Sequence, residues 1–172
     1  MRSLELTLRA DTVGAAEAYR RICEFERYPE LVDEVNAVVV HGREDGGPLL
    51  SDWEIFFRNG LLRWTEVDYF QSEQRRIVFE QTTGDFEVFR GSWGVTAAPG
   101  GCQVRFEATF DFGIPSLAGV LEPIATKVLK EGIALIVHQL LGEATVVGDP
   151  AIAAAVSARL RRRREPDPVL TA

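Results

Sequence analysis

Residues 84–112, GDFEVFRGSWGVTAAPGGCQVRFEATFDF, decide the fold of this chain. They read as two long strands joined by a tight turn at residues 98–101, Ala-Pro-Gly-Gly. Proline presets one φ there, and glycine accepts the positive φ that a hairpin requires. Along residues 104–112 apolar side chains alternate with polar ones. This period of two predicts a sheet with one dry face and one wet face, and the many aromatic residues on the dry face need a cover.

The cover follows directly in the sequence, from Leu117 to Ala144. Apolar residues recur there at helical spacing, and the second half of the segment is apolar almost all round. We therefore expect a buried helix of about seven turns, with Pro123 near its first turn and Gly132 midway, where it can bend. Its longest uncharged stretch, residues 132–142, is shorter than the roughly 20 residues that a membrane span needs.

The rest of the chain predicts an α+β fold with a curved antiparallel sheet of about seven strands. The first strand is expected at Arg2 to Arg9, followed by two short helices near residues 15–22 and 25–32. Further strands are expected near residues 37–40, 49–58, 61–70 and 75–82. Asn59-Gly60 has the residues of a two-residue hairpin turn. We expect one domain over residues 1–147.

Residues 148–172 are expected to form a basic tail outside this domain. The stretch AIAAAVSARLRRRR predicts an alanine-rich helix that ends in a basic run. The simplest interpretation is a solvated, partly disordered terminus. The alternative is a contact with an anionic partner, such as an acyl carrier protein or ribosomal RNA.

Composition limits the classes of function. The 172 residues are 46% hydrophobic and 26% charged with a net charge of −7, which is typical of a globular domain. The tail from Asp149 carries a net +2, which leaves the body at −9, so the body does not attract nucleic acid by its general field. Cys23 and Cys102 are isolated, and no signal peptide precedes them, so reduced thiols and a cytoplasmic location are expected. The sequence leaves the oligomeric state open, and a homodimer is one of the alternatives.

No motif for a metal or a cofactor is present in the sequence. The chain has only two histidines, His41 and His138, which excludes a histidine-rich metal site. Neither a phosphate loop nor a dinucleotide fingerprint occurs, and we expect no cofactor. Any chemistry must come from side chains that point into the space between the sheet and the long helix.

Four stretches carry a resemblance to a known family: FERYPELV at 25–32, RWT at 63–65, GDFEVFRGSWGV at 84–95 and CQVRFEATFDF at 102–112. Together they resemble the helix-grip superfamily of START-related and polyketide cyclase domains over residues 2–145. The Gly84, Phe86, Gly91 and Trp93 spacing is similar to the branch that holds coenzyme Q-binding-like proteins, ribosome-associated toxin-like proteins and polyketide aromatase/cyclases. The resemblance implies a sheet that curls round the C-terminal helix and leaves a deep apolar pocket.

The function that this resemblance implies is that of a polyketide aromatase/cyclase. Such an enzyme would bind a poly-β-ketone or aromatic intermediate and promote aldol cyclisation and dehydration. Two alternatives stay open: a non-catalytic carrier of a hydrophobic molecule such as a quinone, and a regulatory module that binds the ribosome or another partner.

Glu66 and Asp68 are the candidate catalytic acids, because they share one strand face with Trp64. The resemblance implies an inward tryptophan at Trp64, and it puts these two carboxylates where the aromatase/cyclases carry a small polar residue and an arginine. In an aromatic pocket the pKa values of two close carboxylates are raised and pushed apart, which suits general acid and base work. In the other interpretation this face is solvated, and both acids pair with cations across the sheet.

The remaining candidates are one more catalytic residue and a set of aromatic residues. His138 lies on the most apolar part of the long helix, where it could protonate a carbonyl, although a core histidine with local partners is the alternative. We predict an elongated cavity for a ligand of two or more rings. Its candidate lining and ligand-binding residues are Tyr28, Trp64, Phe89, Trp93, Phe106 and Phe110.

Overall fold

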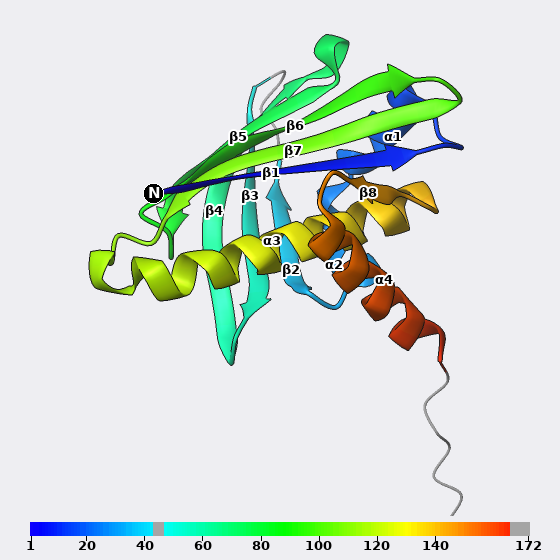
Figure 1. The fold of residues 1–172 in the computed structure, drawn as a ribbon. Helices are drawn as coiled ribbons and strands as arrows, with labels where there is room; N and C mark the ends of the chain where they lie inside the picture. The colour runs from blue at the N-terminus through cyan, green and yellow to red at the C-terminus, as the bar shows by residue number, and fades with distance from the viewer. Residues whose placement is uncertain (43–46, 166–172) are drawn as a thin grey trace, which may run out of the picture.

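The computed structural model describes residues 1–42 and 47–165, and its fold is a single curved sheet gripping a long helix (Figure 1). Every neighbouring pair of strands is antiparallel, in the order β2-β3-β4-β5-β6-β7-β1-β8. The strands are β1 Arg2–Ala10, β2 Val35–His41, β3 Leu49–Phe57, β4 Gly60–Gln71, β5 Arg76–Gly84, β6 Val88–Ala98, β7 Gly101–Asp111 and β8 Thr145–Val147. The predicted α+β helix-grip fold is confirmed, with eight strands rather than seven.

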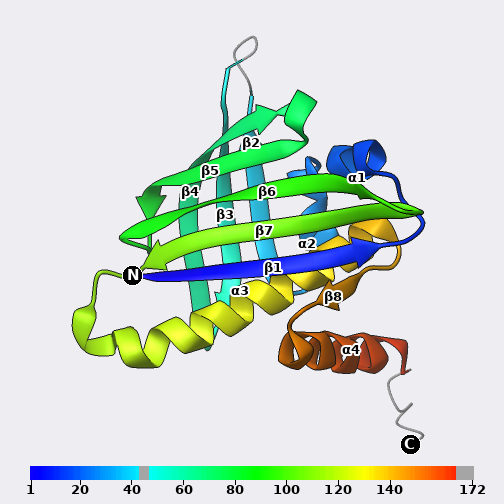
Figure 2. The same cartoon turned by 45° about the horizontal axis from the view of Figure 1, so that its top comes forward.

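The long helix crosses the inner face of the sheet. The helices are α1 Ala15–Ile22, α2 Tyr28–Leu31, α3 Ala118–Leu141 and α4 Pro150–Arg164. Figure 2 shows α3 lying across β2, β3 and β4, while α1 and α2 cover one end of the sheet. The last helical residue is Leu141, and the C-cap is Gly142, whose φ of 81° favours glycine; Pro123 lies inside the helix, just after its first turn.

The predicted hairpin between β6 and β7 is confirmed, with its turn at Pro99-Gly100. Gly100 has a φ of 78°. A Cβ on the next residue, Gly101, would lie 1.9 Å from the carbonyl oxygen of Ala10, so the side of β7 closest to β1 has no room for a side chain there. The glycines of this turn therefore serve both the backbone conformation and the close approach of two strands.

The turn between β3 and β4 lies one residue earlier than predicted. Its loop is Arg58-Asn59, and Arg58 rather than a glycine takes the positive φ of 57°. In this register Trp53 lies directly opposite Trp64, and their rings stack with centroids 5.9 Å apart. We attribute the shift to this pairing, because cross-strand aromatic contacts stabilise a sheet more than the preference of one turn residue.

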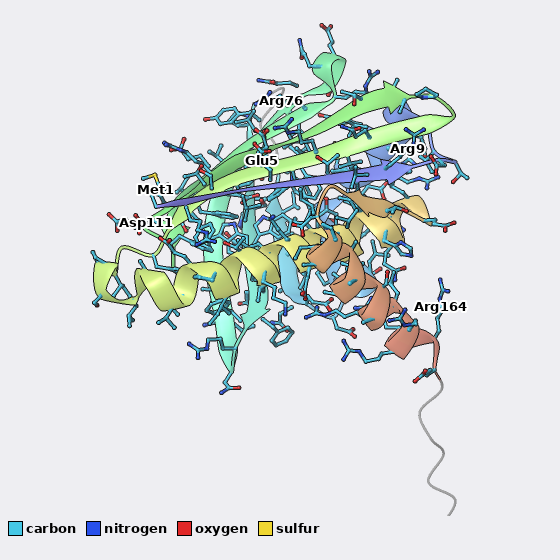
Figure 3. All side chains as sticks on the ribbon, viewed as in Figure 1. Met1, Glu5, Arg9, Arg76, Asp111 and Arg164 are labelled. Atoms are coloured by element: carbon cyan, nitrogen blue, oxygen red, sulfur yellow. The ribbon has the colours of Figure 1, made fainter. Side chains whose placement is uncertain are left out.

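The inner face of the sheet and α3 form the core. Alternate residues of β7, Val104, Phe106 and Phe110, are buried, as the period of two predicted. Glu5 and Arg76 lie on the face turned away from α3 (Figure 3). No helix of the described residues is long and apolar enough to cross a membrane.

The segment after residue 148 corrects the expectation of a solvated tail. Residues 150–164 form α4, which begins with an N-cap: the Asp149 carboxylate accepts a hydrogen bond from the backbone N–H of Ile152 at 3.2 Å. Ile152 and Val156 are buried against the domain. Arg164, at the C-terminal end of α4, points away from the domain (Figure 3). The remaining residues of the expected tail, 166–172, lie outside the described residues.

Candidate functional site

A cavity of about 60 Å³ lies between the inner face of the sheet and the middle of α3. Most of its wall is apolar or aromatic, and it comes from six strands, β2 to β7, and one helix, α3. The residues that line it are Glu34, Val35, Trp53, Ile55, Trp64, Glu66, Phe79, Phe89, Trp93, Phe106, Val128, Leu129, Gly132, Ile133 and Ile136. The three tryptophans of the chain are all among them.

Four of the six predicted ligand-binding residues line this cavity: Trp64, Phe89, Trp93 and Phe106. Phe110 does not. Phe110 is fully buried in the core outside the cavity lining. Its ring packs against Phe86 and Phe112 at centroid distances of 6.1 and 5.8 Å.

Tyr28, also predicted to line the cavity, is not among its lining residues. It is fully buried, and its hydroxyl donates a hydrogen bond of 2.5 Å to the carbonyl oxygen of Ile22. Its ring packs edge-on against Phe25 and Trp53. A phenol whose hydroxyl already has a backbone partner acts as a core residue here.

The cavity is smaller than predicted. An apolar cavity of roughly 150 Å³ binds benzene, a single ring. At about 60 Å³ this cavity leaves no room for a ligand of two or more rings in this conformation. The rings fill the space themselves: Trp64 packs edge-on against Phe89 at 5.1 Å, and Phe79 stacks on Phe106 at 5.7 Å. A polycyclic ligand therefore requires the rings and α3 to move apart.

Glu66 and Asp68 lie on the buried face of β4, with 4% and 0% of their surface exposed, so the interpretation as a solvated face is wrong. The indole N–H of Trp64 donates a hydrogen bond to Oε2 of Glu66 at 2.7 Å. Of the two acids, only Glu66 lines the cavity. Glu66 is thus the acid that a bound molecule would meet first.

Asp68 is held from β3 by a residue that the sequence did not single out. The Ser51 hydroxyl donates to Oδ2 of Asp68 at 2.6 Å, the length of a hydrogen bond to an ionised oxygen. In turn the indole N–H of Trp53 donates to the Ser51 hydroxyl at 2.8 Å. The sequence holds one signal for Ser51: the pattern Ser51-x-Trp53 on one strand and Trp64-x-Glu66 on the next. This signal places Ser51 opposite Glu66 only once the register of the two strands is known.

The charge of this cluster explains the titration of Glu66. Burial raises the pKa of the Glu66 carboxyl well above its ordinary value, and the negative charge of Asp68 and its hydrogen bond raise it further. The indole N–H groups of Trp64 and Trp53 act in the opposite direction but do not outweigh burial. The geometry fits two carboxyl groups, those of Glu66 and Asp68, that together hold one proton, and Glu66 carries it.

This pKa predicts a dependence of stability on pH. In the unfolded chain the carboxyl titrates near 4.5, and in the fold it holds its proton to a higher pH. Stability from this group is therefore full below about pH 4.5 and is lost as pH rises through the folded pKa, by at most about 1.4 kcal/mol per pH unit. Urea unfolding between pH 5 and 8 should show a steeper loss in the native chain than in Glu66→Gln. Equal slopes would contradict the prediction.

His138 does not reach the cavity. Its side chain is half-buried on α3, and its Nδ1 accepts a hydrogen bond of 3.3 Å from the backbone N–H of Ala144, just beyond the end of the helix. It is absent from the residues that line the cavity. The structure thus places it as a residue that closes the C-terminal end of α3, away from Glu66.

Within the described part of the chain no three His, Cys, Asp or Glu side chains lie close enough to hold a metal ion together. Both ionisable residues that line the cavity, Glu34 and Glu66, are acids. The cavity therefore offers a proton donor and acceptor in an aromatic wall, with no arginine, lysine or histidine in its lining.

Comparison with known proteins shows the family of this chain. The sequence profile of polyketide cyclase / dehydrase and lipid transport proteins matches residues 12–134. The chain belongs to this family. No protein with curated annotation is significantly similar to it in sequence.

Solved structures of this polyketide cyclase / dehydrase fold agree with the description above. A Thermus thermophilus protein is 24% identical with a TM-score of 0.71, covering 81% of this chain and 95% of that one. The Zhui aromatase/cyclase from Streptomyces is 14% identical with a TM-score of 0.66, covering 96% of this chain and 99% of that one. A START superfamily protein from Mycobacterium smegmatis is 17% identical with a TM-score of 0.65, covering 81% and 94%. At these identities the likeness is one of fold.

Proposed function

We propose that this chain binds a small, largely apolar carbonyl compound and promotes its aldol cyclisation and dehydration, as a polyketide aromatase/cyclase would. The observation that carries the proposal is Glu66, a buried acid that lines an otherwise aromatic cavity. The family match to cyclases and dehydrases and the fold shared with an aromatase/cyclase support the same chemistry.

The proposed mechanism uses Glu66 as the acid and then as the base. As an enol carbon of the substrate attacks a carbonyl carbon, the carbonyl oxygen takes the proton of Glu66 and becomes a hydroxyl. The Glu66 carboxylate then accepts the proton that the enol oxygen releases as it becomes a ketone. In the dehydration the new hydroxyl leaves as water with the proton that Glu66 has just accepted, and the carboxylate so formed takes a proton from the neighbouring carbon.

Two features of the site fit these roles. Trp64 donates its N–H to one oxygen of the Glu66 carboxyl and fixes the orientation of that group. Asp68 lies behind it and keeps the first proton on Glu66 through its negative charge. The aromatic walls would hold a folded chain with the reacting carbons close together, an effect that lowers a barrier by several kcal/mol.

The proposal predicts discrimination by charge, because the lining of the cavity holds two acids and no cationic residue. We expect 2-acetylnaphthalene, a neutral ketone, to bind at least ten times more tightly than 2-naphthoate, an anion of similar shape. Quenching of tryptophan fluorescence measures both, since all three tryptophans line the cavity. In Asp68→Asn the difference should shrink, because this change removes the negative charge beside Glu66. Binding of 2-naphthoate as tight as that of the ketone would argue against the proposal.

A non-catalytic carrier is the second candidate, and the wall composition favours it equally. Thirteen of the fifteen lining residues are uncharged, and the family includes lipid transport proteins. A carrier would hold its ligand by the aromatic wall alone and would have no turnover to lose when Glu66 is changed.

A further inference from the structure

The less buried part of the cavity lining comes from two segments of the chain. Most of the lining residues are buried, but four are only partly so: Glu34, Val128, Gly132 and Ile133. Glu34 lies just before β2, and the other three lie on one side of α3. We call these four residues the cavity mouth. Its two sides are thus the start of β2 and the middle of α3.

One arginine of α4 connects the two sides of the mouth. The guanidinium of Arg159 donates from Nη1 to Oε1 of Glu34 at 2.8 Å, and its Nη2 lies 3.0 Å from Oε2 of Glu131. Glu131 directly precedes Gly132 of the mouth. Arg163, one turn further along α4, contacts the second oxygen of Glu34 at 3.0 Å. Figure 1 shows α4 beside α2 and α3, in agreement with these ion pairs.

We propose that Arg159 controls access to the cavity: its two ion pairs tie the start of β2 to α3 and keep the mouth narrow until a ligand enters. The inference rests on the proposed function only in assuming that the cavity takes a ligand. It gives α4 a role in ligand exchange, beyond the chemistry at Glu66.

The size of the cavity requires such a movement. At about 60 Å³ it cannot admit a ligand of two rings unless α3 moves away from the sheet and from the start of β2. That movement separates Glu34 from Glu131, so Arg159 must release one of them. Glu131 has 5% of its side chain exposed and Glu34 has 23%. The pair with Glu34 is the one to break, because water screens it more and replaces it more readily.

The test follows entry of 2-acetylnaphthalene by stopped-flow tryptophan fluorescence. Arg159→Met keeps an apolar stem but removes the bridge, and Glu34→Gln removes one side of it without exposing Glu131. Both variants should raise the association rate constant at least tenfold. The dissociation rate constant should rise as well, so that the dissociation constant changes less than either rate. Arg162→Met, a change at an exposed arginine of the same helix, is the matched control and should leave both rates within twofold of the native chain.

Two further measurements keep the inference separate from the proposed function. In the native chain 1 M KCl should speed association, and in Arg159→Met it should not, because the screened bridge is already absent. If the ketone does not bind at all, the proposed function fails. Access is then read from collisional quenching by acrylamide, which should be stronger in Arg159→Met than in Arg162→Met. Native rates and native quenching in both Arg159→Met and Glu34→Gln would overturn the proposal.

Discussion

Replacing Glu66 by glutamine should lower turnover by about 10²–10⁴-fold, the loss typical of a missing general acid or base. The amide keeps the size of the side chain and can still accept the N–H of Trp64, but it can neither give nor take a proton. Product formation with a reconstituted polyketide synthase, followed by chromatography, measures the effect. Binding of 2-acetylnaphthalene should change by less than tenfold, because the aromatic wall is intact.

The matched control is Glu80→Gln, an acid exposed on β5 that lies outside the cavity lining. It should keep native turnover. Full activity in Glu66→Gln would remove this carboxyl from the mechanism. The absence of any turnover in the native chain, together with tight binding of neutral aromatic ligands, would favour the carrier. Asp68→Asn separates the partner acid: it should shift the pH profile of turnover toward lower pH, because the negative charge that raises the pKa of Glu66 is gone.

Replacing Phe110 by alanine should cost about 3–5 kcal/mol of unfolding free energy. Its ring is fully buried and packs against Phe86 and Phe112, so its removal leaves a cavity in the core. Urea unfolding followed by circular dichroism gives the value. Phe56→Ala is the control, since that ring is 49% exposed and its loss should change stability by about 0.5 kcal/mol or less. A cost below about 1 kcal/mol at Phe110 would mean that this end of the core is loosely packed.

Local patterns in the sequence were sufficient for most of the fold. The alternation in β7 and the turn at Pro99-Gly100 predict the hairpin, because each depends only on neighbouring residues. The same holds for α3, whose apolar second half is buried. The register of β3 and β4 was missed, since it depends on the stacking of Trp53 on Trp64 across two strands.

The site was harder to predict than the fold. Acids on a strand are usually exposed, so the pattern around Glu66 left two interpretations open, and only the closed sheet decides between them. Ser51 carries no signal until the register brings it opposite Glu66. Tyr28 and His138 are residue types that often contact ligands. In the structure, however, the polar group of each side chain already forms a hydrogen bond with a backbone group nearby in the sequence. The size of the cavity depends on how all the rings pack together, which no local pattern contains.

The C-terminal helix was predicted, but its packing against the domain was missed for a related reason. Only Ile152 and Val156 mark its buried side, a weak apolar signal among many alanines. Its attachment depends on Arg159 meeting Glu34 and Glu131, which lie far away in the sequence. Runs of arginine at the end of a chain resemble a solvated tail unless their acidic partners are known.

The position of β2 at one edge of the sheet has a consequence for handling the protein. Its outer edge pairs with no other strand of the described residues, and its sequence holds the β-branched run Val38-Val39-Val40, with Val39 53% exposed. Such an edge is a template for adding strands from other molecules, and the bulge between Val35 and Ala37 protects only its start. Aggregation in concentrated or partly denatured samples should therefore begin at β2, and a lysine in place of Val39 should delay it.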